Sequence, residues 1–227
     1  MILAKIIDFI KTYQGNRYAQ LSQDLLVLAV TDSKTNGYFV EFGTMDGRFA
    51  SNTYLLEKEY GWTGILAEPA KKFHEAISHN RSCHVDHRAV TDHTGDRLRF
   101  QEMSTDEGMS GLVDFFDEKE MHFRRRSQTP SEFYDVETVT LDDLLDHYQA
   151  PDHIDYISVD TEGSEPAILG SFDFSRRQID LWTIEHNYLE SARNCIHDIM
   201  TCNGYVRILE QYSQYDDWYV KKQLLQG

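Results

Sequence analysis

A short apolar run followed by a glycine turn, GYFVEFGTMDG at residues 37–47, constrains the fold more than any other part of the sequence. Tyr38 to Phe42 has the length and composition of a buried strand, and Gly43 and Gly47 bound a tight turn. Residues 52–60 then have a helical pattern. This order predicts the opening unit of an α/β sheet that binds a ligand at the carboxyl ends of its strands.

Strand-like and helix-like segments alternate along the rest of the chain. The predicted strands cover residues 64–67, 83–90, 98–101, 154–159, 179–184, 205–209 and 218–221, and the predicted helices cover 1–13, 20–30, 71–80, 141–148 and 188–202. Thr140 is expected to cap the helix that follows it. The alternation predicts a mostly parallel sheet with helices on both faces, closed by an antiparallel pair at the carboxyl terminus.

The length of 227 residues predicts one domain. Residues 1–36 are expected to form N-terminal helices, the first of which packs on the sheet or, alternatively, forms a surface for a partner or a second copy. Residues 103–137 lose the regular pattern and predict an irregular lid or insertion. Within this segment, the arginines at 124–126 either lie on a solvated face or recognise an anionic group of the substrate.

Composition restricts the partners and the compartment. The formal net charge of -16 disfavours nucleic acid and anionic membranes, so a small-molecule substrate is expected. Cys83, Cys195 and Cys202 show no disulfide or metal spacing and predict buried or partly buried free thiols. The N-terminal segment resembles neither a signal peptide nor a membrane span, which predicts a cytoplasmic protein.

The glycine turn does not suit a phosphate. A dinucleotide loop needs a second glycine where this chain has Met45, and Asp46 beside it would repel phosphate. S-adenosylmethionine fits better, because it carries positive charge and ribose hydroxyls but no phosphate. Glu68, at the end of the second strand, is expected to accept the ribose hydroxyls. Glu41 is expected to meet the methionine ammonium, directly or through water, unless it only serves the electrostatics of the turn.

With these residues identified, the chain resembles the FkbM-type family of S-adenosylmethionine-dependent methyltransferases. The likeness rests on GYFVEFGTMDGRFASNTYLLEKEYGWTGILAEPAKKF, NRSCHVDHRAV and IDYISVDTEGSEPAILGSFDF followed by TIEHN. It implies a class I, Rossmann-like methyltransferase sheet of seven strands, the last two antiparallel. It also implies that the cofactor is bound by Glu41, Gly43, Thr44, Met45, Asp46, Gly47, Glu68, Pro69, Ala70, His87, Arg88, Ala89 and Asp160, with Asn52 as a further contact or a helix cap.

The reacting groups are expected at two later strand ends. Asp160, Glu162, Glu185 and His186 follow the strands at 154–159 and 179–184, and His186 is the natural general base unless it is structural. Alternatively, Asp160, Glu185 and His186 hold a divalent cation such as magnesium. Glu162 has a second interpretation as the cap of the helix that begins near Ser164.

These features predict a methyltransferase that acts on a hydroxyl of a sugar or a secondary metabolite. Nitrogen as the acceptor is an open alternative, because no residue of the sequence fixes the nucleophile. The alternative from a different class is an interaction protein that keeps the fold but has no catalytic activity. In such a protein Glu41, Glu68, Asp160 and His186 would be dispensable. The turn at Met45 and Asp46 disfavours a nicotinamide-dependent oxidoreductase.

Overall fold

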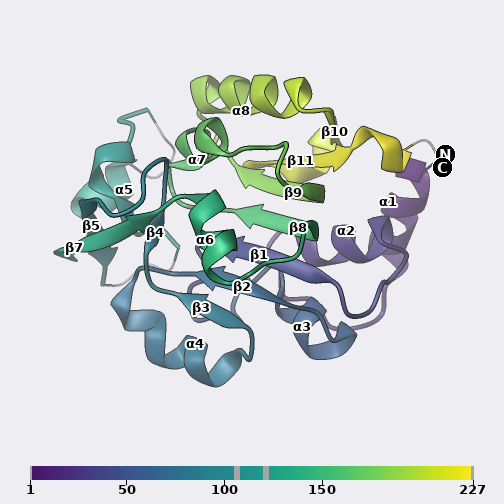
Figure 1. Ribbon diagram of the computed structural model, residues 1–227, viewed down its shortest axis with the longest axis horizontal. Coiled ribbons are helices and arrows are strands. Elements are labelled where there is room, and N and C mark those ends of the chain that lie inside the picture. Colours follow the sequence, from purple (N-terminus) through teal and green to yellow (C-terminus); the bar gives the residue numbers. More distant parts are fainter. Residues whose placement is uncertain (1, 105–107, 120–122, 226–227) are drawn as a thin grey trace.

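A seven-stranded sheet forms the centre of the computed structural model, which describes residues 2–104, 108–119 and 123–225 (Figure 1). The strands across the sheet are β3 (His84–Asp86), β2 (Thr63–Ala67), β1 (Tyr38–Phe42), β8 (His153–Val159), β9 (Gln178–Glu185), β11 (Asp216–Lys221) and β10 (Tyr205–Ile208). The first five run parallel, whereas β11 is antiparallel to both β9 and β10. The prediction of a seven-stranded, mostly parallel sheet is confirmed.

Helices cover both faces of this sheet. One face carries α1 (Ile2–Thr12), α2 (Gln23–Val30), α3 (Tyr54–Tyr60) and α4 (His74–Asn80), and the other carries α6 (Leu141–His147), α7 (Glu165–Ser171) and α8 (Glu190–Cys202). Alternate residues of β1 serve the two cores: Phe39 packs with the first group, and Val40 and Phe42 pack with the second. Ile6 of α1 is buried in the first core, where α1 packs on α2.

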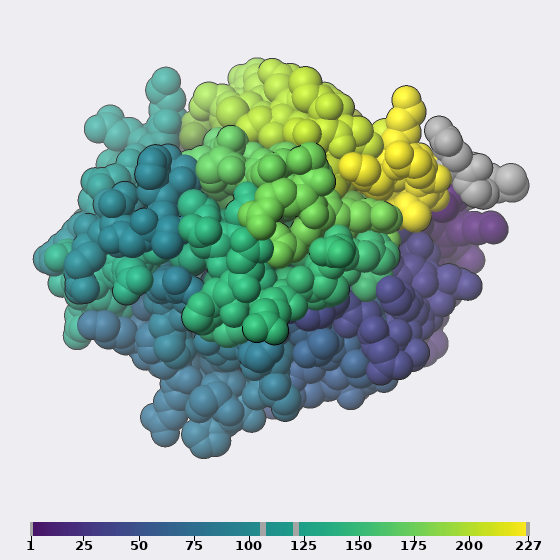
Figure 2. All heavy atoms as spheres, in the orientation of Figure 1, coloured from purple at the N-terminus to yellow at the C-terminus, as the bar shows by residue number. Residues whose placement is uncertain are grey.

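A second, four-stranded sheet adjoins the carboxyl ends of β2 and β3. Its strands, in order across the sheet, are β4 (Ala89–Val90), β7 (Ser131–Val139), β5 (Arg97–Met103) and β6 (Gly111–Leu112). Between β6 and β7 the chain forms η2 (Val113–Phe115) and α5 (Phe123–Gln128). It forms the left end of the molecule in Figure 2, while α1 and η3 (Lys222–Leu225) lie at the opposite end.

The second sheet corrects two predictions. Residues 103–137 are not irregular throughout, because β7 pairs with β5 from Ser131 to Glu137. Asp135 and Glu137 lie on the exposed face of β7 and obscure in the sequence the alternation of Tyr134, Val136 and Thr138 on its inner face. The single strand predicted at 83–90 is two strands in different sheets, since residues 87–88 carry the chain from one sheet to the other.

Several boundaries differ in smaller ways from prediction. The helices expected from residues 20, 52 and 188 begin at Gln23, Tyr54 and Glu190, and the segment from Lys71 to Phe73 is a separate turn of 3-10 helix, η1. The connection between β10 and β11 contains a short helix, α9 (Glu210–Ser213). Thr140 caps α6 as predicted, accepting a hydrogen bond from the main-chain nitrogen of Asp143.

Two findings concern the predicted environment of the chain. All three cysteines are free thiols, but Cys195 and Cys202 are exposed on α8, so the prediction of buried thiols was wrong for those two. Among the residues that the structure describes, every helix is too short or too polar to cross a bilayer.

Candidate functional site

A cavity of about 250 Å³ opens at the carboxyl ends of β1, β2, β8 and β9. The second sheet closes it on one side through Ala89, Val90, Phe100 and Leu112. The predicted site residues on its wall are Gly43, Thr44, Met45, Asn52, Glu68, Pro69, Ala89, Asp160, Glu162 and Glu185. Those that lie outside its lining are Glu41, Asp46, Gly47, Ala70, His87, Arg88 and His186.

Gly43 brings the end of β1 against the end of β8. Its φ of +70° favours glycine, and a Cβ atom there would overlap the main-chain carbonyl oxygen of Asp160. The chain then turns through Thr44 and Met45 over the cavity, and the turn ends at Gly47, where a Cβ would lie 2.9 Å from the Arg81 side chain. The two predicted turn glycines are therefore required by close packing.

Glu68 is a buried carboxylate at the end of β2 and is 5% exposed. One of its oxygens accepts the main-chain N–H of Met45 at 2.9 Å, and the other accepts that of Ala70 at 2.9 Å. Burial raises the pKa of Glu68 to about 7. A carboxylate has about four lone-pair positions, so each oxygen can accept a further hydrogen bond from a ligand in the cavity.

Two buried polar atoms of the cavity wall have no partner within the described parts of the chain. They are the hydroxyl oxygen of Thr44 and the amide oxygen of Asn52. The amide nitrogen of Asn52 donates to the Ser158 hydroxyl at 2.8 Å, which fixes the orientation of the side chain. Because buried polar atoms are rarely left unpaired, these two oxygens are suited to a ligand that donates hydrogen bonds.

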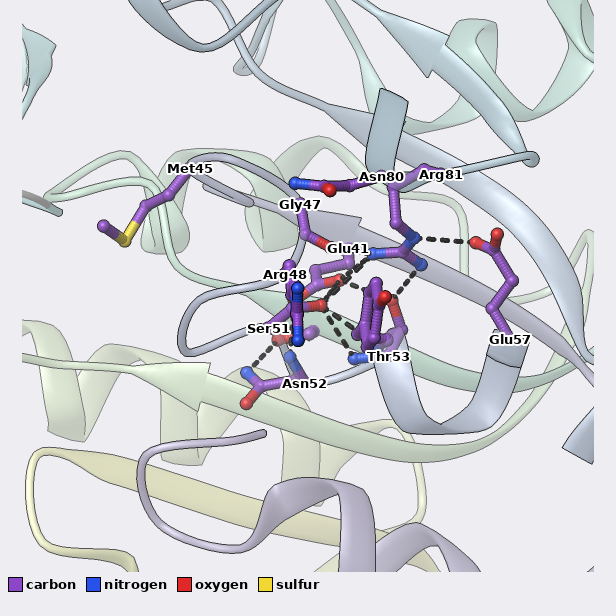
Figure 3. A network of polar contacts seen from close by, with 12 residues as sticks. Glu41, Met45, Gly47, Arg48, Ser51, Asn52, Thr53, Glu57, Asn80 and Arg81 are labelled. Atoms are coloured by element: carbon purple, nitrogen blue, oxygen red, sulfur yellow. Dashed lines mark hydrogen bonds and ion pairs between the residues drawn. The ribbon is translucent and has the colours of Figure 1, made fainter. Parts of the chain in front are cut away.

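Glu41 is buried in a network of polar contacts (Figure 3). It is not among the residues that line the cavity. Its carboxylate accepts the Asn52 main-chain N–H at 2.7 Å and the hydroxyls of Ser51 and Thr53, and it lies 3.5 Å from the Arg81 guanidinium. Arg81 comes from the end of α4, far along the sequence. Glu41 therefore does not line the cavity, contrary to the prediction that it contacts a ligand directly.

The remaining predicted residues of the turn and of the third strand have local roles. Asp46 accepts hydrogen bonds from the main chain of residues 48 and 49, at 2.8 and 2.6 Å. His87 stacks on His74 with ring centroids 3.6 Å apart, and Arg88 makes an ion pair with Asp86 at 2.6 Å. Of His87, Arg88 and Ala89, which were expected to bind the cofactor, only Ala89 is on the cavity wall.

Three carboxylates converge at the other end of the cavity. One oxygen from each of Asp160, Glu162 and Glu185 lies within 4.8 Å of the others. Burial and the neighbouring carboxylates raise all three pKa values well above the ordinary range. Glu162 pairs with Arg126 at 2.8 Å, so it does not cap α7 as its second interpretation held. The helix begins instead with Glu165, which accepts the main-chain N–H groups of Thr161 and Gly163.

His186 does not join this cluster, which corrects the predicted trio of Asp160, Glu185 and His186: Glu162 takes the place of the imidazole. The ring of His186 is buried, its Nδ1 accepts the main-chain N–H of Tyr188 at 3.1 Å, and its Nε2 lies 3.8 Å from Asp217. In the neutral ring the proton is then on Nε2, and the lone pair of Nδ1 is already in use. Burial also lowers the pKa of His186.

Several residues of the wall carried no signal in the sequence. Gln20 and Gln23 precede β1, yet Gln20 accepts the Tyr215 hydroxyl at 2.6 Å and Gln23 donates to Asp216 at 2.7 Å. Phe49 lines the mouth and is 59% exposed. The hydrogen bonds of the two glutamines join segments almost 200 residues apart, so spacing along the sequence does not reveal them.

The family comparison agrees with this geometry. The family model described as the Methyltransferase FkbM domain matches residues 41–219, which includes the glycine turn, Glu68 and the three carboxylates. The chain belongs to this family. It is therefore a methyltransferase by family, as the resemblance implied. No curated protein matches the chain. In this methyltransferase Gln20 and Gln23 lie before the matched region and still reach the cavity.

Proposed function

We propose that the protein transfers a methyl group from S-adenosylmethionine to a hydroxyl of a small molecule, in a class I, Rossmann-like methyltransferase fold. The observation that carries the proposal is the position of Glu68, a buried carboxylate on the cavity wall beside the Gly43 turn. Family membership supports methyl transfer. The choice of cofactor and of acceptor rests on the chemistry of the wall.

The cavity fits this cofactor at three points. Glu68 would accept the ribose hydroxyls, because its oxygens have lone pairs left after their two main-chain hydrogen bonds. The unpartnered oxygens of Thr44 and Asn52 would accept hydrogen bonds from the ammonium of the methionine part. The carboxylates of the wall favour a ligand with positive charge over a phosphate.

The acceptor belongs at the opposite end, beside Asp160 and Glu185. The sheet order places β8 and β9 beyond β1 from Glu68, so the two ends of the cavity are distinct. Methyl transfer is an in-line displacement, and the protein contributes by aligning the nucleophile and excluding water. A hydroxyl must also lose its proton, and a buried carboxylate with a raised pKa is a suitable base. We assign this task to Asp160 or Glu185 in place of His186.

Calorimetry with S-adenosylmethionine and S-adenosylhomocysteine tests the cofactor assignment. Wild-type protein should bind both, and Glu68→Gln should weaken binding by about tenfold or more, since it removes a charge-assisted pair of hydrogen bonds. Glu75→Gln, an exposed carboxylate on α4, is the matched control and should bind like wild type. Absence of binding by folded wild-type protein, or equal affinities in both variants, would sink the proposal.

A screen of candidate acceptors then tests the second half. Release of S-adenosylhomocysteine in the presence of monosaccharides or phenols would support oxygen as the acceptor. Turnover confined to amines would replace oxygen by nitrogen while leaving the cofactor assignment intact.

A further inference from the structure

The cluster of Asp160, Glu162 and Glu185 contains more acidic groups than the neighbouring basic side chains compensate. Arg126 donates to one oxygen of Glu162 at 2.8 Å and so compensates one of the three carboxylates. Within the described parts of the chain, neither Asp160 nor Glu185 has an ion-pair partner. Glu162 and Glu185 are buried, whereas Asp160 is partly exposed on the cavity wall. Ionised carboxylates this close together, two of them buried, are costly unless a proton or a cation compensates them.

Asn187 provides an independent observation at the same place. Its side chain is 6% exposed and reaches into the cluster, where its amide nitrogen lies 2.7 Å from Glu185 and 3.1 Å from Glu162. Its amide oxygen has no partner among the described residues. A half-turn of the amide group would exchange its two ends and bring this oxygen to the carboxylates, where it could serve as a ligand for a cation.

The spacing also fits a metal ion. The three carboxylate oxygens lie within 4.8 Å of one another. Two oxygens on opposite sides of one ion are about 4.2 Å apart for Mg²⁺ and about 5 Å apart for Ca²⁺, so small side-chain rotations suffice. Asp160, Glu162 and Glu185 all line the cavity, which gives an ion a path of entry.

We propose that Asp160, Glu162 and Glu185 bind one divalent cation of the Mg²⁺ or Mn²⁺ type, with the amide oxygen of Asn187 as a fourth ligand. The ion would lie at the acceptor end of the cavity, where it can hold the acceptor oxygen and lower the pKa of its hydroxyl. Cation binding does not depend on the proposed methyl transfer, because it is measured without cofactor or acceptor.

A second group of three residues provides the internal control. His153, Asp155 and Asp180 also bring three ligand atoms within 4.8 Å of one another, at the amino ends of β8 and β9. There the Lys34 ammonium already lies 2.6 Å from Asp155, so a cation of the protein compensates the group. We expect this group to bind no metal.

The first experiment titrates the full chain with MnCl₂ and follows the electron paramagnetic resonance signal of free Mn²⁺. One ion should bind to wild type, Glu162→Gln and Glu185→Gln should each weaken binding at least about tenfold, and Asp180→Asn should leave it unchanged. Thermal unfolding of each variant shows whether it is folded. Absence of binding to wild type at millimolar Mn²⁺, or equal losses in Asp180→Asn and Glu162→Gln, would overturn the proposal.

A measurement on wild type alone covers the case in which the cluster variants do not fold. Bound Mn²⁺ broadens nearby nuclear magnetic resonances, so amide signals of residues 160–162 and 185–187 should disappear at substoichiometric metal. Broadening centred on residues 153–155 and 178–180, or spread evenly over surface acids, would contradict the assignment.

Discussion

Replacing Gly43 by alanine tests whether the glycine turn is fixed by contact with β8. An alanine at a φ of +70° costs about 1–2 kcal/mol relative to glycine. In addition, its Cβ would overlap the Asp160 carbonyl oxygen and lie 3.0 Å from the carbonyl carbon. Main-chain atoms of two adjoining strands cannot rotate away as a side chain can, so this overlap adds about 1–3 kcal/mol. The free energy of unfolding should therefore fall by about 2–5 kcal/mol.

Gly95→Ala is the matched control. Gly95 also has a positive φ, +89°, but a Cβ there would meet nothing within 4 Å. The Gly95→Ala variant should therefore lose only the free energy that alanine costs at a positive φ, about 1–2 kcal/mol. Urea unfolding at constant m-value measures both losses. Equal losses in the two variants, within about 0.5 kcal/mol, would refute the claim that packing against Asp160 fixes the turn.

Three further changes test other parts of the structure. Glu41→Gln should lower the free energy of unfolding by about 1–3 kcal/mol, because Arg81 loses one of its two carboxylate partners and keeps Glu57 at 2.7 Å; unchanged stability with weaker cofactor binding would instead support a direct role for Glu41. The folded-state pKa of Glu68, about 7, is above its ordinary value of 4.5. The stability of wild type relative to Glu68→Gln should thus fall by up to about 3 kcal/mol as the pH rises from 4.5 to 7 in urea unfolding, and a pH-independent difference would contradict the raised pKa. Thr140→Ala should lower the free energy of unfolding by about 1 kcal/mol in the same assay, because it removes the hydroxyl that accepts the main-chain N–H of Asp143. Thr140→Ser keeps a hydroxyl there and should retain most of that stability.

The sequence was informative where structure follows from neighbouring residues. The strand at Tyr38–Phe42 has the predicted bounds, because a short apolar run before a glycine turn has few other ways to fold. Glu68 and the carboxylates after β8 and β9 are on the cavity wall for the same reason: parallel strands end at one edge of the sheet.

The sequence was uninformative where a residue's role depends on a distant partner. Glu41 stands at a strand end like Glu68, but Arg81 reaches it from α4 and takes it into the protein interior. The side chains of His186 and Asn187 are adjacent in sequence, and only the second reaches the carboxylates. Which of two neighbouring polar residues faces a cavity depends on the loop conformation, which local patterns do not specify.

The order of the strands places the two ends of the cavity far apart. Glu68 follows β2 and Tyr215 precedes β11, and four strand spacings of about 4.8 Å place these two strands about 19 Å apart across the sheet. In the proposed reaction the nucleoside occupies the Glu68 end, which lies within the family match at 41–219. The wall at the other end includes Gln20, hydrogen-bonded to Tyr215 and contributed by residues before that match. Choice of acceptor should therefore depend on the N-terminal segment as well as on the shared domain.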